Sequence, residues 1–272
     1  MNIVFCTDEN FVIPCLVSIT SVLENNKDED CCIFVLTNGI SEKSVSKFGL
    51  LADKYGQKIN IVRVDDSYFE GLVTPPYFPR SIYFRYLIPQ ILKTEQKALY
   101  LDCDIIVRGN LKAFYDRCIE GKPCSVVIDQ NSDDVVIKNR VMTSSPYWNS
   151  GVLLMNLQYW RENDVTRRLV EYIGKNPDKC IYPDQDAMNI LFDGLVDYAG
   201  CEYNCQSHWM NDLASSRVSV NHWDEIKKAV SNPVIVHFCE INKPWLPICS
   251  HPLKNEYLHY AYLCKFIAFD SF

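Results

Sequence analysis

Short apolar runs alternate with helical patterns over the first 65 residues. Residues 2–6, 31–36 and 59–64 are short and mainly apolar, as is typical of buried strands. Between them, residues 12–25 and 41–55 carry apolar side chains at helical spacing. This β-α-β-α-β order predicts a parallel sheet with helices on both faces. The first turn after a strand lacks the pattern G-x-G-x-x-G, which argues against the usual dinucleotide fold.

The second half of the chain alternates less regularly. Residues 98–107 give the strongest strand signal, although Pro89 interrupts the helical pattern that precedes them. Further strands are predicted at 124–128, 151–157 and 234–238, and helices at 80–92, 184–192, 222–230 and 254–269. No repeat, linker or clear domain boundary divides the chain, which predicts a single α/β domain.

Composition and charge narrow the class of protein. The chain has 272 residues, of which 48% are hydrophobic and 22% are charged, and these fractions exclude a disordered protein. Its 34 acidic and 27 basic residues give a net charge of −7. Nonspecific nucleic-acid binding needs clustered Lys and Arg, so we expect no nucleic-acid partner.

The cysteines and the apolar runs bear on the compartment. The 13 cysteines follow no regular spacing, which favours reduced, mostly buried thiols. Cys201 and Cys205 have no second pair to complete a zinc site. The N-terminus lacks the basic flank of a signal peptide, and no apolar stretch reaches the about 18 residues of a membrane span. We expect a cytoplasmic protein with at most peripheral membrane contact.

Two acidic residues interrupt the strongest strand pattern. Side chains at i and i+2 of a strand point to one face, so Asp102 and Asp104 are expected to project together, with Cys103 turned into the core. Paired buried carboxylates repel unless a cation neutralises them, and hard oxygen ligands suit Mg²⁺, Mn²⁺ or Ca²⁺. The alternative is an ordinary strand end, where Asp is common.

A histidine and a lysine follow a later apolar run. His237 is a candidate third metal ligand, and a mixed set of imidazole and carboxylates favours Mn²⁺ over Ca²⁺. Lys243 is a candidate to neutralise a phosphate as a point charge. The alternatives are a hydrogen-bonded core histidine and a solvated loop lysine.

Two further polar motifs lie next to buried segments. Asp184 and Asp186 open a predicted helix, where an acidic residue is often only a cap, whereas Gln185 between them has no obvious structural duty. Asn149, Ser150 and Gly151 form a polar turn before a buried strand, and the alternative for them is an ordinary turn.

In this order, the four motifs resemble glycosyltransferase family 8. This family comprises retaining nucleotide-sugar transferases, among them bacterial lipopolysaccharide galactosyl- and glucosyltransferases and glycogenin. The resemblance extends from Asn2 to about Trp245 and includes the opening Ile-Val-Phe-Cys-Thr-Asp-Glu-Asn. It implies a single A-type glycosyltransferase (Rossmann-like) domain with a mixed, mostly parallel central sheet over residues 1–250. Residues 251–272 would then form a C-terminal helix that is packed on the domain or peripheral.

The resemblance also implies the roles of individual residues. Asp102, Asp104 and His237 would hold Mn²⁺, with Mg²⁺ possible, and the metal would bind the diphosphate of a UDP-sugar. The donor-binding positions would be Cys6, Thr7, Asp8, Asn10, Arg85, Cys103, Asn149, Ser150 and Lys243. The catalytic positions around the donor sugar would be Asp184, Gln185 and Asp186. Asp129 ends a strand and is a candidate to bind an acceptor hydroxyl.

One position departs from the family pattern. Family members often carry glycine where this chain has Glu240, and a carboxylate beside a diphosphate repels it unless it is turned away or paired with Lys243. The expected activity is transfer of glucose or galactose from a UDP-sugar to a saccharide or glycolipid acceptor, such as a cell-surface glycan or lipopolysaccharide precursor. A silent sugar-nucleotide or glycan-binding module on the same fold is the alternative, and a metal-dependent nucleotide-sugar hydrolase is a third.

Two segments bear on partners. The Pro-rich stretch at residues 72–80 is a candidate cover for the acceptor. The C-terminal pattern at 254–269 has only two lysines, so we expect a helix packed on the core, and attachment to the inner membrane surface stays open as the alternative.

Overall fold

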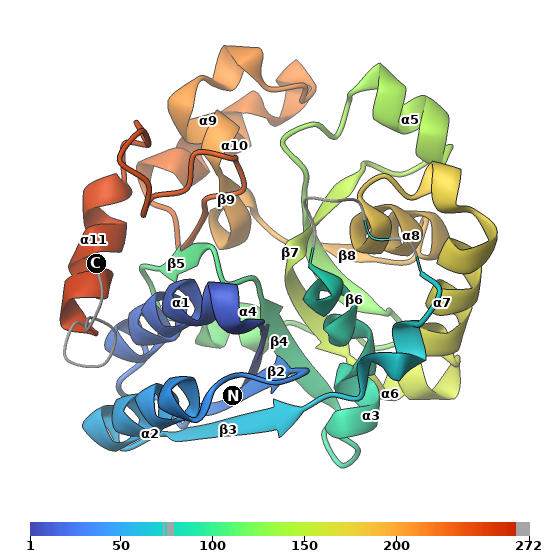
Figure 1. The fold of residues 1–272 in the computed structure, drawn as a ribbon. Helices are drawn as coiled ribbons and strands as arrows, with labels where there is room; N and C mark the ends of the chain where they lie inside the picture. Colours follow the sequence, from blue (N-terminus) through green and yellow to red (C-terminus); the bar gives the residue numbers. More distant parts are fainter. Residues whose placement is uncertain (73, 75–78, 265–272) are drawn as a thin grey trace.

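A seven-stranded mixed sheet forms the centre of the protein (Figure 1). The computed structural model describes residues 1–264 except 73 and 75–78. In spatial order the strands are β3 (Lys58–Arg63), β2 (Cys32–Thr37), β1 (Asn2–Cys6), β4 (Lys97–Leu101), β7 (Trp148–Asn156), β6 (Cys124–Ile128) and β8 (Asp197–Tyr198). β3, β2, β1 and β4 run parallel, whereas β7 is antiparallel to both of its neighbours.

Helices cover both faces of this sheet. On one face lie α1 (Val12–Asn25) and α2 (Glu42–Tyr55), and on the other lie α6 (Leu157–Glu162), α7 (Val165–Lys175) and α8 (Pro183–Leu191). Alternate residues of β1 and β7 enter the two cores, as Ile3 and Val4 of β1 do. The predicted parallel sheet with helices on both faces is therefore confirmed for the first three strands.

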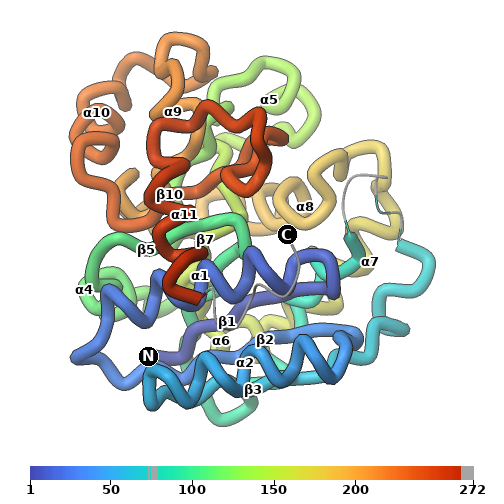
Figure 2. Tube along the Cα trace, turned by 60° about the vertical axis from the view of Figure 1, so that its left-hand side comes forward, coloured from blue at the N-terminus to red at the C-terminus, as the bar shows by residue number. Residues whose placement is uncertain are grey.

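A small second sheet lies beside the first. It consists of β5 (Ile105–Val107), β10 (Ile235–His237) and β9 (Cys205–Gln206). The remaining α-helices of the described residues are α3 (Ile88–Ile91), α4 (Lys112–Tyr115), α5 (Val135–Val141), α9 (Ser207–Asn211), α10 (Trp223–Ser231) and α11 (Lys254–Leu263). α11 lies alongside α1 (Figure 2), and its Tyr257 and Ala261 are buried with Val17 of α1 and Val236 of β10.

Two predicted elements differ from the structure. The prediction of one continuous strand at 98–107 is wrong, because the chain turns at residues 102–104 and continues in the other sheet as β5. The helix predicted at 80–92 is mainly a 3-10 helix, η3 (Arg80–Leu87), followed by the single turn α3. Pro89 has no N–H to donate to the carbonyl of Arg85, so one α-helix over residues 80–92 would lack this hydrogen bond, whereas Pro89 is tolerated in the first turn of α3.

Two predictions fall partly outside the described residues: the acceptor cover at 72–80, most of which lies at 73 and 75–78, and the end of the C-terminal helix beyond residue 264. Among the described helices, none combines the length and the apolar character that crossing a bilayer requires.

The central position of β7 predicts how the protein responds to loss of core volume. Leu154 is fully buried between β4 and β6, so Leu154→Ala leaves a cavity and should lower the free energy of unfolding by about 2–5 kcal/mol. Leu50 on α2 is 54% exposed, and Leu50→Ala should change it by less than about 0.5 kcal/mol. Urea denaturation measures both. Equal losses in the two variants would contradict the assignment of β7 to the core.

Candidate active site

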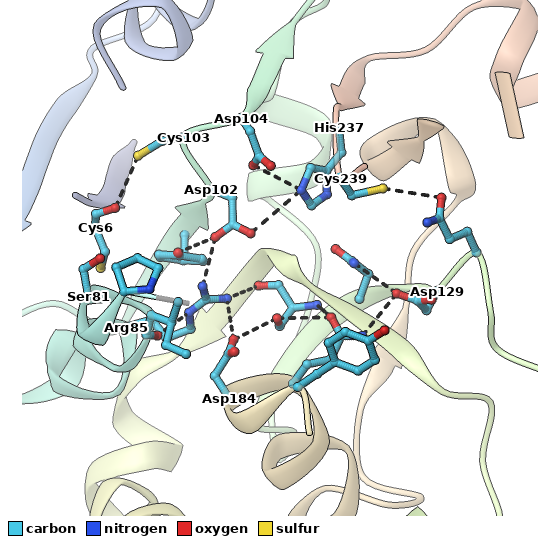
Figure 3. A pocket seen from close by; sticks show the side chains of 18 of the residues that line it. Cys6, Ser81, Arg85, Asp102, Cys103, Asp104, Asp129, Asp184, His237 and Cys239 are labelled. Carbon is cyan, nitrogen blue, oxygen red and sulfur yellow. Dashed lines mark hydrogen bonds and ion pairs between the residues drawn. The ribbon is translucent and has the colours of Figure 1, made fainter. Parts of the chain in front are cut away.

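A cavity of about 360 Å³ opens where the two sheets diverge. Its walls come from the end of β1, the turn at 102–104, the start of β7, the start of α8 and the end of β10 (Figure 3). This is the edge beyond the carboxyl ends of β1 and β4, where open α/β sheets bind their ligands. The site is therefore assembled from segments that lie far apart in the sequence.

Asp102, Asp104 and His237 meet in this cavity. One ligand atom from each lies within 4.8 Å of the others, and among the described residues this is the group with the composition of a metal site. Nε2 of His237 lies 3.2 Å from Oδ1 of Asp104 and 3.8 Å from Oδ2 of Asp102 (Figure 3). Two carboxylate oxygens and one imidazole nitrogen are a donor set that fits Mn²⁺ or Mg²⁺.

A turn, and not an extended strand, brings the two carboxylates together. The backbone N–H of Asp102 donates to Gly151 O of the large sheet at 2.8 Å, whereas Asp104 O accepts at 2.9 Å from the N–H of Phe238, which directly follows β10 of the small sheet. Between them Cys103 is buried, and its thiol donates to the carbonyl of Cys6 at 3.3 Å. The expectation that Cys103 turns inward is met, although the strand geometry that suggested it is absent.

Lys243 neutralises the inner carboxylate. Its ammonium donates to Oδ2 of Asp104 at 2.6 Å and to the carbonyl of Phe238 at 2.7 Å. Burial opposes ionisation of Asp104, but the positive charge and hydrogen bond of Lys243 oppose that effect, and the pKa of Asp104 is held well below its usual range. Asp104 is therefore ionised at neutral pH and offers an anionic oxygen to a cation.

Glu240 points away from this group. Its carboxylate lies 2.9 Å from Nε2 of His208 and accepts from the amide of Asn211 at 3.3 Å. It does not line the cavity, whereas Lys243 does. Glu240 is therefore tolerated at this position because it is turned away from the cavity, and not because it is paired with Lys243.

A buried arginine joins the metal-facing and inner walls of the cavity. The guanidinium of Arg85, 3% exposed, lies 3.0 Å from a carboxylate oxygen of Asp102 and 3.0 Å from one of Asp184. It also donates to the carbonyl of Ser150 at 2.8 Å and lies 4.3 Å from the ring centre of Tyr100. Burial raises the pKa of Asp184, and the positive charge of Arg85 opposes that rise.

Gln185 and Asp129 face each other across the inner end of the cavity. Gln185 donates to Oδ2 of Asp129 at 3.2 Å, and its carbonyl accepts from Ser150 N at 2.9 Å. Asn149 also donates to Oδ2 of Asp129, at 3.0 Å. Burial raises the pKa of Asp129, and the hydrogen bonds from Asn149 and the backbone of Asn131 oppose the shift. Ser150 in turn donates to Asp184 at 3.0 Å.

Four of the predicted site residues do not line the cavity. Asp186 is fully buried behind its wall, where its carboxylate accepts from Arg140 at 2.8 Å and from the hydroxyl of Tyr147 at 2.6 Å. The predicted direct contact of Asp186 with a sugar is therefore corrected: Asp186 supports the cavity wall through Arg140 and Tyr147. The others follow β1: Thr7 is buried, Asp8 caps the next turn through the N–H groups of two residues, and Asn10 is exposed. In this segment Cys6 reaches the cavity.

Asn204 and Tyr100 contact the predicted metal ligands, and the motifs do not point to either of them. Oδ1 of Asn204 lies 3.0 Å from Nδ1 of His237, and the hydroxyl of Tyr100 donates to Asp102. Asn204 lies in the short 3-10 helix η5 (Cys201–Asn204), where the sequence has no periodic pattern. In the sequence Tyr100 is one of several mainly apolar residues of a strand, so its hydrogen bond to Asp102 could not be predicted from the pattern.

The family follows from the match to a sequence model. The model of glycosyl transferase family 8 matches residues 2–249. The chain belongs to glycosyl transferase family 8. The resemblance drawn from the four motifs is thereby confirmed.

Relatives of this family 8 glycosyltransferase match nearly its whole length. General stress protein A of Bacillus subtilis is 28% identical over 97% of this chain and 94% of its own. The lipopolysaccharide 1,2-glucosyltransferase of Escherichia coli K12 is 25% identical, and the lipopolysaccharide 1,3-galactosyltransferase of Salmonella typhimurium is 26% identical. Each of these two matches covers 94% of this chain and 76% of the relative.

A solved structure confirms the fold of this family 8 chain. The galactosyltransferase LgtC, in complex with donor and acceptor sugar analogues, superposes with a TM-score of 0.88 at 27% identity. The superposition covers 97% of this chain and 96% of LgtC. The predicted α/β fold of the A-type glycosyltransferases, with a mixed central sheet, is therefore confirmed.

Gly151 offers a test of the candidate metal ligands. A Cβ on Gly151 would collide with the ring of His237 and lie 2.7 Å from Oδ2 of Asp102. Gly151→Ala should therefore push the imidazole and carboxylate apart and weaken Mn²⁺ binding by about 10- to 100-fold. Gly49 in α2 has open space around its Cβ position, so Gly49→Ala is the matched control and should leave binding unchanged. Titration of the ligand-free protein with Mn²⁺ measures both, and unchanged binding in Gly151→Ala would contradict the assignment.

Proposed function

We propose that the protein is a metal-dependent, retaining hexosyltransferase that moves glucose or galactose from a UDP-sugar to a saccharide acceptor. The observation that carries the proposal is the convergence of Asp102, Asp104 and His237 beside the ammonium of Lys243. The three candidate ligands would hold a divalent cation, and together with the Lys243 ammonium this cation would balance the negative charge of a diphosphate at this end of the cavity. Relatives named as lipopolysaccharide glucosyl- and galactosyltransferases support the hexose and a glycan or lipopolysaccharide precursor as acceptor.

The donor is proposed to lie along the cavity from the β1 end to α8. Cys6 and Cys103, which line the cavity, would receive the nucleoside, and Thr7, Asp8 and Asn10 would complete its binding from the segment that follows β1. Arg85, Asn149 and Ser150 would receive the donor sugar. Asp102, Asp104 and His237 would hold a divalent cation, which would supply positive charge for the leaving diphosphate. Lys243 adds a second positive charge at the same end, held in place by Asp104.

Sugar transfer itself is proposed to proceed by front-face substitution. Gln185 has an amide, which is a poor nucleophile, and the carboxylate of Asp184 is held by both Arg85 and Ser150. These groups are therefore suited to orient the sugar and stabilise its developing positive charge. The leaving phosphate would accept the proton of the acceptor hydroxyl. Asp129, at the inner end of the cavity, would position that hydroxyl, and Asp186 would hold the start of α8 through Arg140.

The orientation of Glu240 supports the enzyme over the silent binding module. Glu240 is the feature that favoured the module, because a carboxylate beside the diphosphate would oppose donor binding. Its contacts with His208 and Asn211 turn it away from the Lys243 side. The cytoplasmic location and the peripheral membrane contact stay predictions of the sequence.

Release of UDP tests the proposed activity. With a saccharide acceptor panel and Mn²⁺, we expect UDP release from UDP-glucose or UDP-galactose that EDTA abolishes. Asp102→Asn removes one anionic ligand and should lower kcat by about 10²- to 10³-fold, while the thermal midpoint without metal is retained. Asp178 is exposed and does not line the cavity, so Asp178→Asn is the control and should keep full activity. Full activity of Asp102→Asn would contradict its assigned role, and a rate that no acceptor changes would indicate a hydrolase.

Mass spectrometry tests front-face substitution. After incubation with donor and Mn²⁺, we expect no covalent sugar adduct on the protein, and we expect products that keep the anomeric configuration of the donor by NMR. The reason is that Asp184 is already held by two partners and Asp186 lies behind the cavity wall. A sugar adduct on either aspartate would contradict this mechanism and favour double displacement.

A further inference from the structure

A chain of hydrogen-bonded side chains runs from the metal-facing histidine to the sugar-facing amide. Nδ1 of His237 lies 3.0 Å from Oδ1 of Asn204, whose amide nitrogen donates to Oδ1 of Asn149 at 2.9 Å. Asn149 then donates to Oδ2 of Asp129 at 3.0 Å, and Gln185 donates to the same oxygen at 3.2 Å. Each of these five side chains therefore has at least one hydrogen-bond partner among the others, and Asn204 is fully buried.

Backbone N–H groups fix the direction of this chain. Gly151 N donates to Oδ1 of Asn149 at 3.0 Å, and a backbone N–H can only donate. The other end of that amide, Nδ2, therefore faces Asp129. In the same way Ser150 N donates to the carbonyl oxygen of Gln185, which leaves the Gln185 nitrogen for Asp129. Neither amide can turn over without setting its NH₂ group against a backbone N–H.

This direction determines which nitrogen of His237 carries a proton. Because Oδ1 of Asn149 can only accept, the atom of Asn204 that faces it must be the amide nitrogen. Oδ1 of Asn204 then faces the imidazole and requires a proton on Nδ1 of His237. Nε2, on the opposite side of the ring, is left to point at Asp102 and Asp104.

We propose that Asn204 is a positioning residue that holds His237 in the tautomer whose Nε2 lone pair faces the metal, and that joins this ligand to Gln185 through Asn149 and Asp129. The inference rests on the proposed function. In the other neutral tautomer, Nδ1 and Oδ1 of Asn204 would meet as two acceptors, and an N–H on Nε2 would occupy the side where the cation binds. The same hydrogen bonds that select the ligand atom also orient the amide beside the donor sugar.

Replacement of Asn204 by leucine tests the role of its oxygen. Asn204→Leu keeps a similar volume but removes both hydrogen bonds, and it should raise the Mn²⁺ dissociation constant of the ligand-free protein by 10- to 100-fold. EPR of unbound Mn²⁺ measures this constant without substrate or turnover. Asn26 is 2% exposed, donates to Val22 O and accepts from Leu111 N, and therefore serves as a matched buried asparagine outside the cavity. Asn26→Leu should lower the thermal midpoint and leave Mn²⁺ binding unchanged.

A second variant separates the two bonds of Asn204. Asn204→Asp keeps an oxygen for Nδ1 of His237 but loses the donor to Asn149. We expect its Mn²⁺ dissociation constant to stay within about threefold of the native value and its kcat to fall at least tenfold, since Gln185 is no longer held through Asn149 and Asp129. This variant carries the test if Asn204→Leu does not fold.

The outcomes that overturn the inference differ from those that overturn the proposed function. Native protein that binds no Mn²⁺ and releases no UDP would remove the proposed function and this inference with it. Native protein that binds Mn²⁺, together with an Asn204→Leu variant that binds it equally well, would overturn the inference alone. So would equal losses of Mn²⁺ binding in Asn204→Asp and Asn204→Leu, because the oxygen would then have no separate role. Native kcat in Asn204→Asp would overturn the connection to Gln185.

Discussion

The repulsion among four carboxylates is the constraint around which this site is built. Of the described residues that line the cavity, the anionic ones are Asp102, Asp104, Asp129 and Asp184. Two cationic side chains, Arg85 and Lys243, lie among them, so two negative charges remain when all four acids are ionised. Burial makes such an excess costly. A divalent cation is the addition that balances it, which gives an electrostatic reason for a metal in this position.

Arg85 and Lys243 neutralise carboxylates at different places in the cavity. Arg85 is shared by Asp102 and Asp184 and is also stacked on Tyr100, so it fixes the distance between these two acids. Lys243 comes from a loop and has one acidic partner, Asp104. A loop lysine is a point charge that can adjust to a phosphate, whereas the planar guanidinium is held by several partners at once.

The fold and the candidate metal ligands could be predicted from the sequence, but the geometry that joins them could not. The periodic patterns of residues 2–64 predicted the parallel strands well, because local hydrophobic spacing determines those elements. Asp102 and Asp104 were identified as a pair for a partly wrong reason, since the strand ends at Leu101 and a turn carries them. Asn204 could not be found from spacing, because it acts through contacts with residues more than 30 positions away. Asp186 shows the opposite error, since its place in a polar motif does not reveal that it faces Arg140.

The turn at 102–104 also links the candidate active site to the packing of the two sheets against each other. Asp102 is hydrogen-bonded to the seven-stranded sheet, whereas Asp104 directly precedes β5 and His237 ends β10 of the three-stranded one. An ion bound by all three residues would link the two sheets. Its affinity would then be linked to their docking, so that detachment of the smaller sheet would release the ion, and loss of the ion would loosen the smaller sheet.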